Sequence, residues 1–166
     1  MMIPVQDYLS ILLAVVLGAA IGAEREISGK AAGLRTNVLI CLGAAVFTII
    51  SKDMGLGTPE GSLTRVAAQI VSGVGFLGAG AIIQDRGGVH GLTTAATIWL
   101  VASIGTACGA RFYHLAVAVT IIAVVVLVVL GKLTRPLEQF GIRHNLRGTH
   151  HIHDGTCGKP DDTPPL

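Results

Sequence analysis

Three glycines in the middle of the sequence match the spacing of a nucleotide-binding loop. Gly73, Gly75 and Gly78 fit the pattern G-x-G-x-x-G. That pattern binds a dinucleotide when a strand precedes it and an acidic residue follows about 20 residues later within a βαβ unit. These glycines lie instead inside a long apolar segment without charge, where such a unit has no place. Together with Gly80 they predict a smooth helix face for packing, and we expect no cofactor.

The polar end of the chain carries residues that can bind a metal ion. These are His144, His150, His151, His153, Asp154 and Cys157. Zinc, nickel and copper use such ligands, but this spacing matches no ordered site, so the sequence leaves metal binding open. The chain contains neither an H-E-x-x-H nor a G-x-x-x-x-G-K-[ST] motif, and its apolar segments hold no nucleophile with a nearby histidine. We therefore predict that it is not an enzyme.

The composition predicts that most of the chain lies in a membrane. Hydrophobic residues make up 51% of the 166 residues and charged residues only 13%, whereas a soluble domain carries about 25% charged residues. Five segments contain no Asp, Glu, Lys or Arg, and their lengths approach the roughly 20 residues that cross a bilayer as a helix. They are 8–23, 36–51, 66–84, 87–110 and 112–131. We predict an all-α integral membrane bundle of about five transmembrane helices, with residues 87–91 as a loop and the fourth helix starting near Leu92.

Lysine and arginine are distributed unevenly between the two sides of this predicted bundle. The loops 23–35 and 84–91 and the part after residue 131 would share one side, and together they carry nine Lys and Arg residues. The other side carries three, Lys52, Arg65 and Arg111. The positive side is normally cytoplasmic. We expect the N-terminus outside, the C-terminus in the cytoplasm, a transmembrane domain over 1–135 and a flexible, polar, histidine-bearing tail over 136–166.

Charged and small residues at the segment ends and within the segments suggest sites of contact. Glu24 and Arg25 directly follow the first segment, and such a polar rim suits an ion, a lipid headgroup or a partner, although charge at a membrane interface is ordinary. We regard Glu24 as the most informative, because it continues the apolar segment. Two pairs of glycines four residues apart favour close helix packing. They are Gly18 with Gly22 and Gly105 with Gly109.

Polar side chains inside the third and fourth segments provide an alternative hypothesis, a transporter or channel for a cation or small solute. Gln69, Thr93 and Thr94 are among them. Hydroxyl and amide groups can line a narrow path, but more often they bond to a carbonyl one turn back or to a neighbouring helix. No Asp or Glu lies in the middle of a segment, which argues against a dedicated magnesium channel, because Mg²⁺ loses its water reluctantly.

Four longer motifs carry a family resemblance. They are GAERE at 22–26, GLRT at 33–36, RVAAQIVSGVGFLGAG at 65–80 and GLTTAATIW at 91–99. Over roughly 12–130 the chain closely resembles the MgtC/SapB family. The resemblance implies a multi-pass protein of the bacterial inner membrane with about five transmembrane helices. By motif position it also marks ten residues as functionally important: Glu24, Arg25, Arg35, Thr36, Arg65, Gln69, Asp85, Thr93, Thr94 and Trp99.

The resemblance also implies a role. Members of the family are linked to growth in low magnesium and, in several pathogens, to survival inside macrophages, and they are regarded as regulators of membrane processes. We therefore expect a regulator that contacts the lipid bilayer and another membrane protein, and a homodimer or higher oligomer is compatible with its small-residue faces. Many members carry an ACT-like domain after the helices, and we expect a short, SapB-like member without it; Thr93 stands where some members have asparagine. The net charge of +2 and the lack of a basic run argue against nucleic acid.

Overall fold

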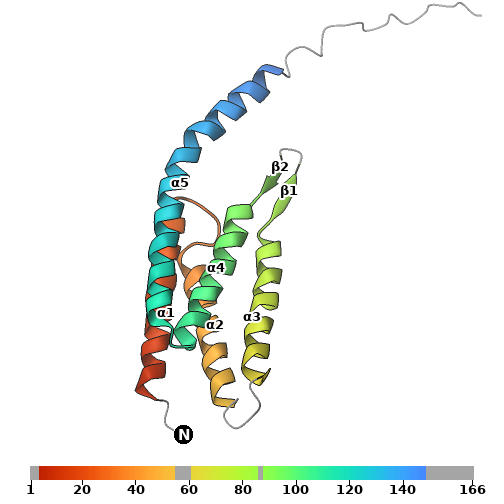
Figure 1. The fold of residues 1–166 in the computed structure, drawn as a ribbon. Coiled ribbons are helices and arrows are strands. Elements are labelled where there is room, and N and C mark those ends of the chain that lie inside the picture. The colour runs from red at the N-terminus through yellow and green to blue at the C-terminus, as the bar shows by residue number, and fades with distance from the viewer. Residues whose placement is uncertain (1–3, 55–60, 86–87, 149–166) are drawn as a thin grey trace, which may run out of the picture. The chain divides into compact units, whose positions relative to one another are not determined.

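The computed structural model describes residues 4–54, 61–85 and 88–148. These residues form five helices and one hairpin of two strands (Figure 1). In chain order the elements are α1 (Val5–Ile27), α2 (Leu34–Met54), α3 (Gly61–Gly80), β1 (Ile83–Asp85), β2 (Gly88–His90), α4 (Leu92–Gly109) and α5 (Tyr113–Gly148). The predicted all-α bundle of about five helices is confirmed.

Four of the described helical segments are long and apolar enough to cross a membrane. They are Val5–Ile27, Leu34–Met54, Leu92–Gly109 and Tyr113–Leu133. A shorter apolar segment, Ala68–Gly80, belongs to α3. The chain is therefore a multi-pass membrane protein, and its predicted orientation stays a prediction.

The chain divides into two compact units, Met1–Val128 and Val129–Leu166. The first unit holds α1 to α4, the hairpin and the beginning of α5. In the second unit, the described residues 129–148 continue α5 as a helix past the predicted domain boundary at residue 135. Residues 149–166, which hold most of the predicted histidine-bearing tail, lie outside the described residues.

The helix α1 extends beyond the uncharged segment that predicted it. Glu24 and Arg25 form part of its last turns, and a basic residue there complements the negative end of the helix dipole. The helix stops where Gly29 takes a left-handed conformation, with φ at +63°. The N–H groups of Gly29 and Lys30 then donate to the carbonyls of Glu26 and Arg25, which satisfies two carbonyls at the helix end.

The hairpin is a feature that the sequence did not predict. The third uncharged segment runs to residue 84, but α3 ends at Gly80, and Ile83–Asp85 pairs antiparallel with Gly88–His90. Gly91 follows with φ at +87°, and a β-carbon there would collide with the carbonyl of Ala81. The helix α4 begins at the next residue, Leu92, as predicted.

Small and apolar side chains fill the interior of the first unit. Its main core consists of Ala14, Leu17, Ile21, Cys41, Ala45, Val101, Ile104, Cys108, Ala116 and Ala123. Large apolar side chains point outward instead, and several are more than half exposed: Val5, Leu12, Phe47, Phe76, Phe112 and Ile122. A soluble protein rarely exposes so much apolar surface, so this distribution fits a surface covered by lipid.

Four glycines allow α2 to approach α1 and α4 closely, and we call Gly18, Gly22, Gly105 and Gly109 the glycine seam. A β-carbon on Gly18 would lie 2.8 Å from Cβ of Cys41, and one on Gly22 would lie 2.8 Å from Cα of Leu34. On the α4 side, a β-carbon on Gly105 would collide with the carbonyl oxygen of Cys41, and one on Gly109 would lie 2.5 Å from that of Ala45. Real β-carbons do not come so close to other heavy atoms, so these contacts require glycine.

Candidate functional site

Arg25 is the most deeply buried of the charged candidate residues whose side chains the structure describes. It lies three residues after Gly22 and seven after Gly18, so it continues the face of α1 that packs within the bundle. Its side chain is 4% exposed. The Nη2 group donates a hydrogen bond of 3.2 Å to Oγ1 of Thr94, in the first turn of α4. The Nε group is buried and has no partner among the described residues, so a desolvated guanidinium remains only partly satisfied.

The two glutamates beside Arg25 in the sequence are directed to other groups. Oε1 of Glu24 accepts a hydrogen bond of 2.8 Å from the Ser28 hydroxyl, and its Oε2 is buried without a partner in the described part of the chain. Oε2 of Glu26 accepts the backbone N–H of Leu34 at 3.0 Å. Glu26 thereby satisfies a donor at the start of α2 and fixes the turn between the first two helices.

Asn37 is a buried polar residue that the sequence analysis missed. It is fully buried near the start of α2, and its Nδ2 group donates to the carbonyls of Ala32 and Gly33. Ala32 has a left-handed backbone, with φ at +55°, and the amide braces this turn. Oδ1 of Asn37 has no partner within the described residues. The sequence feature that could have revealed Asn37 was an amide side chain inside the second uncharged segment.

Five further candidate residues are exposed in the described part of the chain: Arg35, Thr36, Gln69, Thr93 and Trp99. The side chains of Arg65 and Asp85 lie outside the described part of the structure. Among the described side chains, the structure thus joins two of the predicted residues by a hydrogen bond, Arg25 and Thr94, and Glu24 directly precedes Arg25 in the sequence.

The third helix presents a face that the described residues of the chain leave uncovered. Gln69, Gly73, Phe76 and Gly80 recur at helical spacing and are all exposed, and we call them the free face of α3. A β-carbon on Gly73 or Gly80, or on the nearby Gly75, would meet no described atom within 4 Å. Gly78 differs, because its β-carbon would make ordinary contact with Ala95 of α4. The predicted packing glycines of α3 thus divide into one that faces α4 and three that face open space.

An apolar groove lies between α3 and α4, with a volume of about 150 Å³. It is lined by Ile70, Val71, Val74, Trp99, Ala102, Ser103 and Thr106. The hydroxyl of Ser103 donates to the carbonyl of Leu100 and that of Thr106 to the carbonyl of Ala102. These hydroxyls bond within their own helix, so the groove is suited to apolar groups more than to a hydrated ion.

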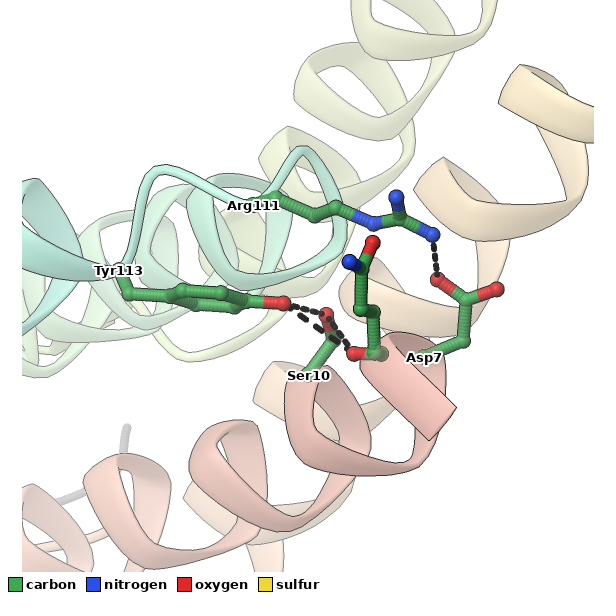
Figure 2. A network of polar contacts seen from close by, with 5 residues as sticks. Asp7, Ser10, Arg111 and Tyr113 are labelled. Atoms are coloured by element: carbon green, nitrogen blue, oxygen red, sulfur yellow. Dashed lines mark hydrogen bonds and ion pairs between the residues drawn. The ribbon is translucent and has the colours of Figure 1, made fainter. Parts of the chain in front are cut away.

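A polar network ties the start of α1 to the start of α5 (Figure 2). Nη2 of Arg111 donates to Oδ1 of Asp7 over 2.8 Å, and Asp7 is almost completely buried. The hydroxyl of Tyr113 lies 2.9 Å from Oγ of Ser10 and donates to the carbonyl of Gln6 over 3.1 Å. The sequence analysis did not single out these residues. The signal that could have indicated them was a pair of opposite charges, Asp7 and Arg111, which lie beside apolar segments on the same predicted side of the bundle.

Arg111 ends α4 in a conformation that glycine usually adopts. Its φ is +67°, where a β-carbon is unfavourable. The N–H groups of Arg111 and Phe112 donate to the carbonyls of Cys108 and Ala107, which is the pattern of a Schellman motif. The hydrogen bond to Asp7 raises the pKa of the Arg111 guanidinium. Arginine is charged throughout the physiological range in any case, and the ion pair with Asp7 joins this helix end to the start of α1.

The model of the MgtC family matches residues 11–136. The chain belongs to the MgtC family. The matched range contains the contact between Arg25 and Thr94, the glycine seam and the free face of α3, whereas Asp7 lies before it.

Curated relatives in the MgtC family are similar over most of this chain. The protein named MgtC from Salmonella typhimurium strain LT2 is 44% identical over 156 residues, which cover 93% of this chain and 65% of that protein. The MgtC protein of Brucella abortus strain 2308 is 46% identical over 144 residues, which cover 87% of this chain and 59% of the relative. This chain thus spans about three fifths to two thirds of the length of these relatives. No solved structure matches this chain.

Proposed function

We propose that this chain is a protein of the bacterial inner membrane that regulates other membrane proteins in adaptation to low magnesium or stress. The observation that carries the proposal is the free face of α3. Gly73 and Gly80 leave its backbone open, while the glycine seam shows how the same residue type is used where helices of this chain meet.

The physical argument rests on how helices associate in lipid. Apolar side chains gain little by leaving lipid for another apolar surface, so association depends on close packing, which glycine permits. On the free face, Gln69 adds an amide that can bond across to a second helix, and Phe76 is 81% exposed. A face with two glycines, one amide and one large aromatic ring suits a helix of a partner membrane protein.

The family context supports the biological part of the proposal. This chain is similar to proteins named MgtC along nearly its whole length, and the resemblance links such proteins to growth in low magnesium. The alternative, a cation or solute transporter, receives less support. Hydroxyls that would line a path, such as those of Thr97 and Thr106, donate to carbonyls one turn back in α4.

A crosslinking experiment in native membranes tests the proposal. A photoreactive amino acid replaces Phe76 on the free face of α3 in the full chain, and in a matched variant it replaces Ile122 of α5, which is 62% exposed. Cells grown in low magnesium are irradiated, and the adducts are identified by mass spectrometry. We expect position 76 to capture another membrane protein that position 122 does not capture. Adducts with this chain alone, or the same adducts from both positions, contradict the proposal.

A further inference from the structure

Among the described residues, no side chain caps the start of α4. Its N-cap residue is Gly91, which has no side chain to accept a hydrogen bond from the first turn. The first bond of the helix is from the N–H of Ala95 to the carbonyl of Gly91, so the N–H groups of Leu92, Thr93 and Thr94 have no helical acceptor. A helix of 18 residues also places the positive end of its dipole here.

A second positive group lies at the same place. The Arg25 guanidinium contacts Thr94 within the first turn of α4, its side chain is 96% buried, and its Nε group has no acceptor among the described residues. A buried cation beside the positive end of a helix is unfavourable unless an anion compensates for both. Oε1 of Glu24 is bonded to Ser28 and Oε2 of Glu26 to Leu34, while Oε2 of Glu24 is buried without a described partner. The charge of Glu24 therefore offsets part of the Arg25 charge, and it leaves the first-turn N–H groups of α4 without a described acceptor.

We propose that Arg25, Thr94 and the first-turn amides of α4 bind a phosphate group, supplied either by an anionic phospholipid or by free phosphate. A phosphate has several acceptor oxygens and can engage backbone N–H groups, a hydroxyl and a guanidinium together. Arg25 lies two residues before the end of α1 at Ile27, and the end of a spanning helix is the depth of phospholipid headgroups. This site goes beyond the proposed function and does not depend on the free face of α3.

The test uses the purified full chain in a maltoside detergent that contains no phosphate. The thermal unfolding midpoint is measured while sodium phosphate is titrated against sodium chloride of equal ionic strength, and separately while phosphatidylglycerol is titrated against an uncharged glycolipid. Because a ligand that binds the folded state raises the midpoint, we expect a rise with at least one of the two phosphate sources. The arm that responds identifies the source.

Two variants and a control assign the response to the site. Arg25→Gln removes the guanidinium, and we expect it to weaken binding about tenfold or more, as for a lost hydrogen bond to a charged group. Thr94→Val removes only the hydroxyl and keeps the shape of the side chain, so it is informative even if Arg25→Gln does not fold. Lys30→Gln removes an exposed positive charge from the neighbouring loop, and its binding should equal that of the unmodified chain.

Two outcomes overturn the proposal. The first is a midpoint that neither phosphate source raises. The second is binding that both site variants retain unchanged. Retained binding by Lys30→Gln with weakened binding by Arg25→Gln and Thr94→Val supports a phosphate site at the start of α4.

Discussion

Glycines serve two regions of this bundle in different ways. In the glycine seam, Gly105 lies so close to α2 that a β-carbon would collide with the carbonyl of Cys41. On α3, a β-carbon on Gly73 or Gly80 would meet no described atom within 4 Å. The residue type and the apolar surroundings are the same in both regions. The difference is therefore whether another described helix of the chain lies against the glycines.

This difference separates glycines that hold the fold from glycines that remain available for contact. A glycine inside a helix is unfavourable by about 1 kcal/mol relative to alanine, and close packing compensates for it in the seam. The free face of α3 has no such compensation within the described residues. Substitutions can thus show whether the two regions differ in stability as they differ in geometry.

The largest effect is expected in the seam, for Gly105→Ala. The added β-carbon meets a backbone carbonyl, which cannot rotate away, so α2 and α4 must move apart. We expect a loss of about 3 kcal/mol or more in the free energy of unfolding, at the upper end of overpacking effects. Unfolding of the purified chain in mixed micelles measures it.

Gly75→Ala is the matched control for this substitution. It makes the same chemical change inside a helix, but the new methyl group enters open space. The difference between the two variants cancels the intrinsic preference of helices for alanine and isolates the cost of the collision. Equal stability of the two variants would break the distinction between the regions.

A smaller effect is expected for Tyr113→Phe, which tests whether polar contacts stabilise the bundle in addition to the close packing of the glycine seam. The substitution removes the hydroxyl that contacts Ser10 and the carbonyl of Gln6 (Figure 2). We expect a loss of about 1 kcal/mol in the free energy of unfolding, the usual value for a hydrogen bond. Tyr8→Phe is the control, because Tyr8 is 59% exposed. A loss as large as that of Gly105→Ala would mean that the network, and not close packing, dominates stability.

The helices were predictable from the sequence because charge is excluded from the interior of a bilayer. Five uncharged segments correspond to five helices, and the start of α4 at Leu92 follows from the glycine-rich residues before it, although Gly88–His90 form a strand where a loop was predicted. The ends of α1 and α3 were not predictable in this way. Charged residues continue α1 through its last turn, and the hairpin shortens α3, because strand pairing of three residues on each side leaves little periodic signal.

The candidate site was predictable in its residues more than in its arrangement. The sequence favoured Glu24 as the group that dips into the bundle, because it directly follows the apolar segment. The structure buries Arg25 more deeply, because its spacing from Gly18 and Gly22 places it on the packed face of α1. Its contact with Thr94 joins residues 69 positions apart. Such pairings depend on how helices pack, which one sequence without relatives does not reveal.

The smallest effect on stability is expected on the free face of α3, and there it should have the opposite sign. Gly73→Ala adds a methyl group that meets no described atom of another element within 4 Å, so we expect unchanged stability or a gain of up to about 1 kcal/mol from helix preference. Gly73→Leu should also fold, but its larger side chain would keep a partner helix away. In the crosslinking experiment at position 76, Gly73→Leu should therefore lose the captured partner while Gly73→Ala weakens it less. If Gly73→Leu instead destabilises the purified chain as strongly as Gly105→Ala, the free face of α3 packs within the protein, and the contrast between the two regions is wrong.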